Sequence, residues 1–182
     1  YKFLEERPKG ERRLEGYLFP DTYRVTRGDS VRFLIDNMLK RFDLEMEELD
    51  YPSRAERAGL TLHEAVTIAS LIEREAKIDE ERPLISGVIH NRMEKSMLLQ
   101  IDATVQYALG TNKAQIYYKD LEVDSPYNTY KNNGLPPGPI AMPGRSSLLA
   151  AVEPAETAYL YYVARPDGSH AFATNNTDHE AN

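Results

Sequence analysis

The segment that most constrains the fold is 61–77, TLHEAVTIASLIEREAK, which has the pattern of an amphipathic helix. Thr61 and Glu64 carry the signature of a capping box, in which the Thr61 hydroxyl accepts from the Glu64 amide and the Glu64 carboxylate reaches back. The apolar residues that follow recur at helical spacing and form one broad face. We therefore expect a helix from about Thr61 to about Lys77 with this face against a hydrophobic core.

Two glutamates lie on the flanks of that apolar face. At about 100° per residue, Glu73 falls roughly 80° to one side of its centre and Glu75 roughly 80° to the other. A carboxyl group beside apolar neighbours loses hydration, which raises its pKa and suits it to donate a proton near neutral pH. The alternative is a solvated glutamate that pairs with Arg74 or Lys77, and the spacing alone does not choose between them.

Three further helices are predicted from the residues at their ends. A serine caps the segment 30–49, and little helix is expected before it. A proline suits the first turn of the segment 83–95. Asp102 is expected to cap a short helix that Gly110 ends.

Two other segments lack helical periodicity. Residues 14–25, LEGYLFPDTYRV, indicate a strand or an extended segment followed by a turn at Pro-Asp-Thr. Residues 124–144 contain five prolines and no sustained period, which is unusual for a compact domain unless the loop is functional or disordered. Its apolar and aromatic residues favour an ordered lining.

The C-terminal part of the chain predicts one helix and one hairpin. Ser146 or Ser147 is expected to cap a short helix through about Val152. Residues 159–175 contain two strand-like runs around Pro-Asp-Gly-Ser, which is a hairpin signal. The last residues resemble the start of a further helix. Together these elements predict an α+β fold, mainly helical, with a few short strands and a C-terminal β-hairpin.

The composition narrows the possible functions. The chain has 182 residues, 41% of them hydrophobic, which suffices for one full core. A formal net charge of −7 argues against nucleic acid or anionic lipid as a partner. The absence of cysteine excludes disulfides, thiolate metal sites and a cysteine nucleophile. No apolar run is long enough to cross a bilayer, and the charged first residues do not resemble a signal peptide.

Motifs for other chemistries are incomplete or missing. Residues 63–67, HEAVT, begin like a zinc-binding helix, but Thr67 stands where a second histidine is needed. The other histidines, His90, His170 and His179, are scattered along the chain. There is no nucleophile elbow, phosphate-binding glycine loop or Ser-x-x-Lys motif. We therefore expect no metal and no cofactor. The chemistry that stays possible is a reaction catalysed by an acidic side chain.

Six blocks in this order resemble the endolytic murein transglycosylase family, also called MltG or YceG-like. They are LEGYLFPDTY (14–23), ASLIEREA (69–76), GVIHNRM (87–93), LQIDATVQYALG (99–110), SPYNTY with GLPPGPIAMPG (125–144) and YLYYVARPDGSHAFATN (159–175). The likeness runs from about residue 14 to the end of the chain. It implies a catalytic domain over 14–182 whose last helix is cut short, preceded over 1–13 by a linker or the tail of a LysM-like module.

The resemblance also implies an activity and a setting. Members of the family cut the bond between N-acetylmuramic acid and N-acetylglucosamine in peptidoglycan strands and leave a 1,6-anhydro end. The family's acid maps onto Glu73. Glu75 could support it by orienting its surroundings, or could form an ordinary salt bridge. The resemblance further implies a single-pass anchor in the bacterial cytoplasmic membrane, a catalytic domain outside it, and cell-wall synthases as possible partners.

The substrate-binding candidates are polar or aromatic residues of the matching blocks: Gln100, Asp102, Tyr127, Asn128, Thr129 and Tyr130. Each has an ordinary alternative: Asp102 could simply cap a helix, Asn128 could simply shape a turn, and the tyrosines could simply pack in the fold.

Two other functions stay open. One is a muramidase in which Glu73 works with Asp102 or Glu75, and the other is a glycan-binding module built on the tyrosines.

Overall fold

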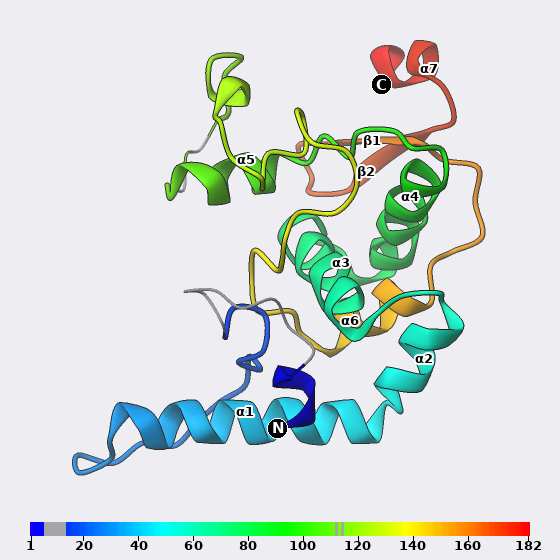
Figure 1. The fold of residues 1–182 in the computed structure, drawn as a ribbon. Coiled ribbons are helices and arrows are strands. Elements are labelled where there is room, and N and C mark those ends of the chain that lie inside the picture. The colour runs from blue at the N-terminus through cyan, green and yellow to red at the C-terminus, as the bar shows by residue number, and fades with distance from the viewer. Residues whose placement is uncertain (6–13, 112, 114) are drawn as a thin grey trace.

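The computed structural model describes residues 1–5, 14–111, 113 and 115–182 (Figure 1). Within them the chain forms an α+β fold, as predicted. The α-helices are α1 (Val31–Glu48), α2 (Tyr51–Arg57), α3 (Leu62–Glu75), α4 (Arg82–Glu94), α5 (Asp102–Leu109), α6 (Arg145–Val152) and α7 (Asn176–Ala181). The 3-10 helices are η1 (Lys2–Leu4), η2 (Asp79–Glu81) and η3 (Asp120–Glu122), and the strands are β1 (Tyr161–Ala164) and β2 (His170–Ala173).

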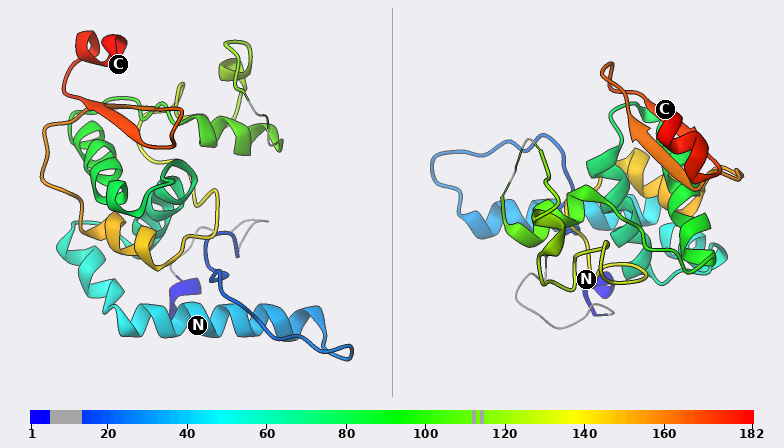
Figure 2. Two further views of the ribbon diagram at one scale, coloured as in Figure 1. Left: turned by 180° about the vertical axis from the view of Figure 1, so that it is seen from behind. Right: turned by 90° about the horizontal axis from the view of Figure 1, so that it is seen from above.

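The central element is α3, against which α2, α4, α5 and α6 all pack (Figures 1 and 2). The capping box of Thr61 and Glu64 is present, so the predicted start is confirmed. The helix ends at Glu75, because the next residue, Ala76, turns to an extended conformation. Every residue from 65 to 72 is buried, so α3 is enclosed on all sides rather than on one face. The buried hydroxyls of its middle turn are satisfied by main-chain groups.

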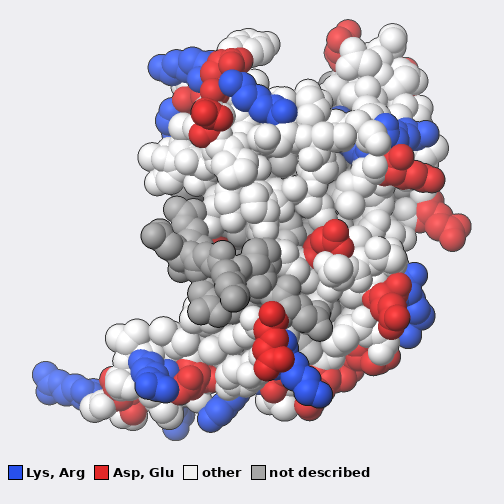
Figure 3. Space-filling view, viewed as in Figure 1, with Lys and Arg blue, Asp and Glu red and all other residues white. Residues whose placement is uncertain are grey.

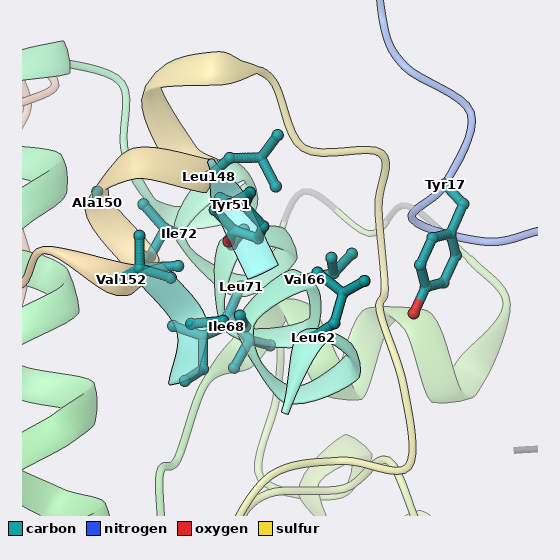
Figure 4. Packing of buried hydrophobic residues seen from close by; sticks show 14 of the residues in the cluster. Tyr17, Tyr51, Leu62, Val66, Ile68, Leu71, Ile72, Leu148, Ala150 and Val152 are labelled. Atoms are coloured by element: carbon teal, nitrogen blue, oxygen red, sulfur yellow. The ribbon is translucent and has the colours of Figure 1, made fainter. Parts of the chain in front are cut away.

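The core is formed mainly where α3 meets α6 and α2 (Figure 4). The side chains labelled there from these helices are Leu62, Val66, Ile68, Leu71, Ile72, Leu148, Ala150, Val152 and Tyr51. The predicted end of α6 at Val152 is confirmed, but the predicted serine caps are wrong. The helix begins after Gly144 and has no side-chain cap, and Ser147 is buried inside its first turn.

The helix α1 begins as predicted, because the Ser30 hydroxyl accepts from the Phe33 amide. Its buried Glu45 carboxylate forms ion pairs with Arg41 and Arg145, and the second of these joins α1 to α6. The short helix α2 was not predicted. It follows Asp50, whose φ of 46° turns the chain sharply between α1 and α2.

The starts and ends of α4 and α5 confirm two predictions and correct a third. A proline lies in the first turn of α4, which ends before Lys95. Gly110 ends α5 with a φ of 65°. Asp102 is not the cap of α5, because Ile101 holds that position and Asp102 is the first helical residue. Its carboxylate instead accepts a hydrogen bond from Tyr130.

Residues 14–25 form no strand. The chain makes a turn over residues 14–17 and then runs extended, with Tyr17 and Phe19 buried, and no turn is assigned at Pro-Asp-Thr. Gly16 has a φ of 84°, and a Cβ there would lie 2.5 Å from Pro139. The segment therefore crosses the 124–144 loop at a point where only glycine fits.

The 124–144 loop contains neither helix nor strand and runs along α3 (Figure 1). Its Ile140 amide donates to the Ser70 hydroxyl of α3 at 3.0 Å, and Ile140 is buried. The Nε2 atom of His63 lies 2.9 Å from the carbonyl oxygen of Pro137. The expectation of an ordered lining is confirmed.

The C-terminal hairpin is also confirmed. Strands β1 and β2 pair antiparallel, with Tyr162 opposite Phe172 and Ala164 opposite His170. A helix, α7, follows, capped by the Asn175 side chain. Strand β1 contacts α4, and its Tyr162 is hydrogen bonded to Glu75 at the end of α3.

Two predictions concern the chain beyond these elements. The domain boundary predicted at residue 13 lies in the range 6–13, outside the described residues, and stays a prediction. None of the described helices is both long and apolar enough to span a bilayer. In Figure 3 charged side chains are visible along α1, on the two upper projections and along the right-hand edge of the molecule.

Candidate active site

A pocket of about 540 Å³ lies between the C-terminal end of α3, the start of α5 and the C-terminal hairpin. Its lining residues are Glu75, Arg92, Leu99, Gln100, Asp102, Tyr130, Tyr161, Tyr162, Val163, Ala164, His170, Asn176 and His179. Four of these were predicted as site residues from sequence, namely Glu75, Gln100, Asp102 and Tyr130. They come from three separate segments, so the fold brings them together.

Glu75 is the last residue of α3, and its carboxyl group is a wall of the pocket. The Tyr162 hydroxyl donates to its Oε2 at 3.1 Å, and the Ala103 amide also donates to the carboxyl group. Burial raises the pKa of Glu75, and this effect outweighs the hydrogen bond from Tyr162 that lowers it. The nearby charge of Asp102 raises it further. Glu75 is thus a carboxyl group whose protonated form is favoured.

Asp102, Tyr130 and Gln100 lie at the mouth of the pocket. The Tyr130 hydroxyl donates to Asp102 Oδ1 at 2.6 Å, which fixes the position of both groups. Gln100 and Asp102 are exposed. Gln100 has a φ of 53°, and its amide donates to the Thr129 carbonyl oxygen at 3.1 Å. The left-handed turn leaves the Gln100 side chain exposed, and its Oε1 accepts from Nη1 of Arg92 at 3.4 Å.

Arg92 of α4 holds the base of the pocket. Its guanidinium group donates to the carbonyl oxygens of Leu98, Leu99 and Leu160, and it lies 5.0 Å from the centre of the Tyr161 ring. Among the described residues no carboxylate forms an ion pair with it. Because its hydrogen bonds join α4, the turn before α5 and the start of β1, Arg92 fixes these segments relative to one another.

The hairpin is attached to the rest of the site through His170. The His170 side chain is 4% exposed, and its Nδ1 lies 2.7 Å from Glu81 Oε2. The His170 amide donates to the other oxygen of the same carboxylate at 3.0 Å. Burial alone would raise the pKa of Glu81, but the hydrogen bonds from His170 lower it overall. The Tyr162 ring then packs edge-on against His170, with ring centres 5.4 Å apart.

Glu73 lies elsewhere, facing the start of α6. Its Oε2 accepts from the Gly144 amide at 3.0 Å and from the Ser147 hydroxyl at 2.7 Å. The Arg82 guanidinium lies 3.6 Å from the same oxygen. These contacts join Glu73 to the start of α6 and to Arg82, and Glu73 is not among the residues that line the pocket. The catalytic role predicted for Glu73 stays a prediction, without support from this geometry.

The other predicted site residues lie beside the pocket rather than in its wall. Asn128 and Thr129 are buried. The Asn128 side chain donates to two carbonyl oxygens of the preceding segment. The Thr129 hydroxyl accepts from the Ile101 amide at the start of α5. The Tyr127 ring packs on Tyr107 with centres 4.7 Å apart. These residues support the segments that carry Gln100, Asp102 and Tyr130.

Sequence reasoning missed Tyr162, His170 and Arg92 as site residues. Tyr162 and His170 belong to the hairpin block, where alternation predicts strands but does not indicate which element the strands cover. In the sequence, nothing distinguishes Arg92 from any other charged residue near the end of a helix. The described residues contain no group of three or more His, Asp or Glu side chains placed to hold a metal ion.

Comparisons with known proteins give a consistent result. The sequence model of the YceG-like family matches residues 2–182. An endolytic murein transglycosylase of Bacillus subtilis is 46% identical over 167 residues, which cover 91% of this chain and 46% of that protein. One from Streptococcus pneumoniae is 40% identical over 176 residues, covering 93% of this chain and 32% of that protein. The chain thus spans less than half the length of these relatives.

A solved structure is similar over nearly the whole fold. The crystal structure of a yceG-like protein from Listeria monocytogenes has a TM-score of 0.87 and 42% sequence identity. The match covers 98% of this chain and 58% of that one.

Proposed function

Because the chain belongs to the YceG-like family, we propose that it is the catalytic region of an endolytic lytic transglycosylase that cuts bacterial peptidoglycan. The bond cut joins N-acetylmuramic acid to N-acetylglucosamine within nascent glycan strands, and the product carries a 1,6-anhydro-muramic end. This activity would terminate strands during cell-wall biogenesis. Two relatives that are 46% and 40% identical are named for the same activity.

The main observation in support of the proposal is the position of the Glu75 carboxyl group in the wall of the pocket. It is the carboxyl group with a raised pKa that shares a pocket with Gln100, Asp102 and Tyr130. We assign the role of general acid to Glu75 on this ground. The rival assignment to Glu73 rests on resemblance, whereas its contacts with the start of α6 and with Arg82 are those of a residue that joins α3 to neighbouring segments.

The reaction needs only one carboxyl group of the protein. Protonated Glu75 gives its proton to the glycosidic oxygen, and the bond from that oxygen to the anomeric carbon of the muramic ring breaks. The 6-hydroxyl of the same ring attacks the anomeric carbon, and the Glu75 carboxylate takes the proton released from that hydroxyl. No water is consumed, and Glu75 ends the cycle protonated.

The remaining task of the protein is positioning. Because the nucleophile belongs to the substrate, holding the ring in a reactive shape gives a large intramolecular advantage. The hydrogen bond between Tyr130 and Asp102 presents a fixed polar edge to a sugar at the pocket mouth. Gln100, exposed beside it, can bind a hydroxyl or acetamido group.

The test compares Glu75→Gln and Glu73→Gln with the unchanged protein on purified peptidoglycan, with products analysed by mass spectrometry. We expect Glu75→Gln to abolish release of anhydro-muropeptides, with a loss of at least about a thousandfold in rate. Glu73→Gln should keep measurable activity, reduced in step with any loss of stability. Loss of activity in Glu73→Gln alone, with the fold intact, would instead assign the role of general acid to Glu73.

The same experiment separates the other candidate functions. A muramidase would release products one water heavier than the anhydro form, and Asp102, in the same pocket as Glu75, would be its second carboxylate. A glycan-binding module would bind strands without turnover by the unchanged protein. Products of anhydro mass from the unchanged protein would exclude both.

We also propose the setting that the resemblance implies. The protein acts on the extracytoplasmic side, held at the cytoplasmic membrane by a single N-terminal anchor outside the chain described above. Its partners are then peptidoglycan strands and the cell-wall synthases that make them. Fractionation of the full-length protein with the membrane, and its release when the segment before this chain is deleted, would test the anchor.

A further inference from the structure

The hairpin contributes the one side-chain hydroxyl, among the described residues, that is hydrogen bonded to Glu75. We propose that Tyr162 is a positioning residue for the reaction: its hydroxyl orients the Glu75 carboxyl group and stabilises the carboxylate that forms when Glu75 releases its proton. The inference rests on the function proposed above and adds a residue that neither the sequence blocks nor the relatives' names assign.

The geometry places Tyr162 for this role. Its hydroxyl lies 3.1 Å from Oε2 of Glu75 and both residues line the same pocket. This hydrogen bond restricts the orientation of the Glu75 carboxyl group within the pocket. Burial raises the pKa of Tyr162 well above its usual value, so the hydroxyl remains a donor throughout the working range of pH.

The strand register explains how Tyr162 is held. His170 lies opposite Ala164, two residues from Tyr162, so both rings project from the same face of the hairpin. The His170 ring packs edge-on against Tyr162, and its Nδ1 and its amide both bind the Glu81 carboxylate. Glu81 directly precedes α4. The position of the Tyr162 hydroxyl is thus tied to a helix of the core rather than to a free hairpin.

The chemical effect follows from the change of charge on Glu75. The hydrogen bond from Tyr162 is weak while Glu75 is protonated and becomes charge-assisted once the proton has moved to the glycosidic oxygen. It therefore stabilises the transition state of the first step more than the ground state. The 6-hydroxyl of the substrate supplies the proton that restores Glu75 in the second step, so Tyr162 neither gains nor loses a proton.

Other groups around Glu75 also affect the equilibrium between its protonated and ionised forms. From α5, the Asp102 charge disfavours the Glu75 carboxylate and the Ala103 amide favours it. His170 of β2 favours the carboxylate weakly through its charge. Tyr130, from the 124–144 loop, and Arg92, from α4, line the same pocket. The contribution of Tyr162 is separable from these because removing one hydroxyl leaves them all in place.

The experiment uses Tyr162→Phe, which keeps the ring and its packing against His170. Tyr159→Phe is the matched control, because Tyr159 is a tyrosine just before the same strand that packs on Phe172 and does not line the pocket. Turnover on purified peptidoglycan is measured from about pH 5 to 9, with Glu75→Gln alongside. The Glu75 pKa is measured in each unliganded variant by carbon NMR of labelled glutamate, with the resonance assigned through Glu75→Gln.

We expect Tyr162→Phe to lower turnover about ten- to a hundredfold, the usual effect of losing a hydrogen bond to a charged group. Because that bond favours the carboxylate, its loss raises the Glu75 pKa, so the NMR titration and the alkaline limb of activity both move to higher pH. Equal turnover and equal Glu75 titration in Tyr162→Phe and Tyr159→Phe would overturn the inference. Full activity of Glu75→Gln would instead overturn the assignment of the acid.

Discussion

At the scale of single residues, two glutamates of one helix lie in different environments. Glu75 faces a pocket where burial raises its pKa, whereas Glu73 accepts two hydrogen bonds at the start of α6 and lies near Arg82. Helical periodicity placed both on the flanks of the apolar face and could not distinguish them. They differ in the segment that packs over each flank of α3. The hairpin covers Glu75, and the start of α6 covers Glu73.

The raised pKa of Glu75 predicts a pH-dependent effect of Glu75→Gln on stability. A carboxyl group whose folded-state pKa exceeds its unfolded value, about 4.3, stabilises the fold at low pH. That contribution disappears as pH rises through the folded pKa. The free energy of unfolding of Glu75→Gln, relative to the unchanged protein, should therefore increase as the pH rises from about 4.3 towards the folded-state pKa. Urea unfolding at a series of pH values measures this, and a difference that stays constant with pH would contradict it.

At the scale of elements, the accurate predictions rest on local signals. The capping residues Thr61 and Ser30 mark the starts of α3 and α1, and Gly110 marks the end of α5, because each satisfies main-chain groups within a few residues. The short helix α2 was missed because it follows Asp50, whose left-handed conformation has no local sequence signal and directs α2 against both α1 and α3. The serine caps of α6 were wrong because Ser147 serves Glu73 and Arg82 instead.

The site was predictable only in part. Gln100, Asp102 and Tyr130 could be proposed because they are polar or aromatic residues of the matching blocks, and all three line the pocket. Tyr162 and His170 could not be placed, since their roles depend on which face of the hairpin meets α3 and α4. That contact is made over a long sequence separation and leaves no local pattern.

The contact between α4 and the segment before the hairpin predicts the effect of Gly87→Ala. A Cβ on Gly87 would lie 2.7 Å from the Ala155 carbonyl oxygen, and the Ala155 amide is bound to the first turn of α4. Alanine normally favours a helix over glycine by about 1 kcal/mol. Here the overlap with a fixed main chain should outweigh this and lower the free energy of unfolding by about 1–3 kcal/mol in urea titrations.

The matched control in the same helix is Ser86→Ala. The Ser86 hydroxyl is buried and has no hydrogen-bond partner among the described residues. Its removal should leave the stability unchanged or slightly higher. Equal stability of Gly87→Ala and the unchanged protein would mean that the segment of Ala155 moves freely relative to α4.

At the scale of the whole molecule, α3 joins a stabilising core to the proposed site. The helix α3 packs against α2 and α6 in the core (Figures 1 and 4). Its last residue, Glu75, lines the pocket between α3, α5 and the hairpin. In the pocket, the hydroxyls of Tyr162 and Tyr130 are hydrogen bonded to Glu75 and Asp102. The core encloses the Tyr51 hydroxyl, which has no partner among the described residues.

This separation predicts that Tyr51→Phe raises stability without changing activity. Tyr51 is fully buried, and removing a hydroxyl that has lost its hydration and gained no partner should raise the free energy of unfolding by about 1 kcal/mol. Tyr17→Phe is the contrasting variant, because the Tyr17 hydroxyl is bonded to His63 at 2.8 Å and its loss should lower stability. Urea unfolding and peptidoglycan turnover of both variants test this. A fall in turnover for Tyr51→Phe would show that the core and the pocket are coupled through α3.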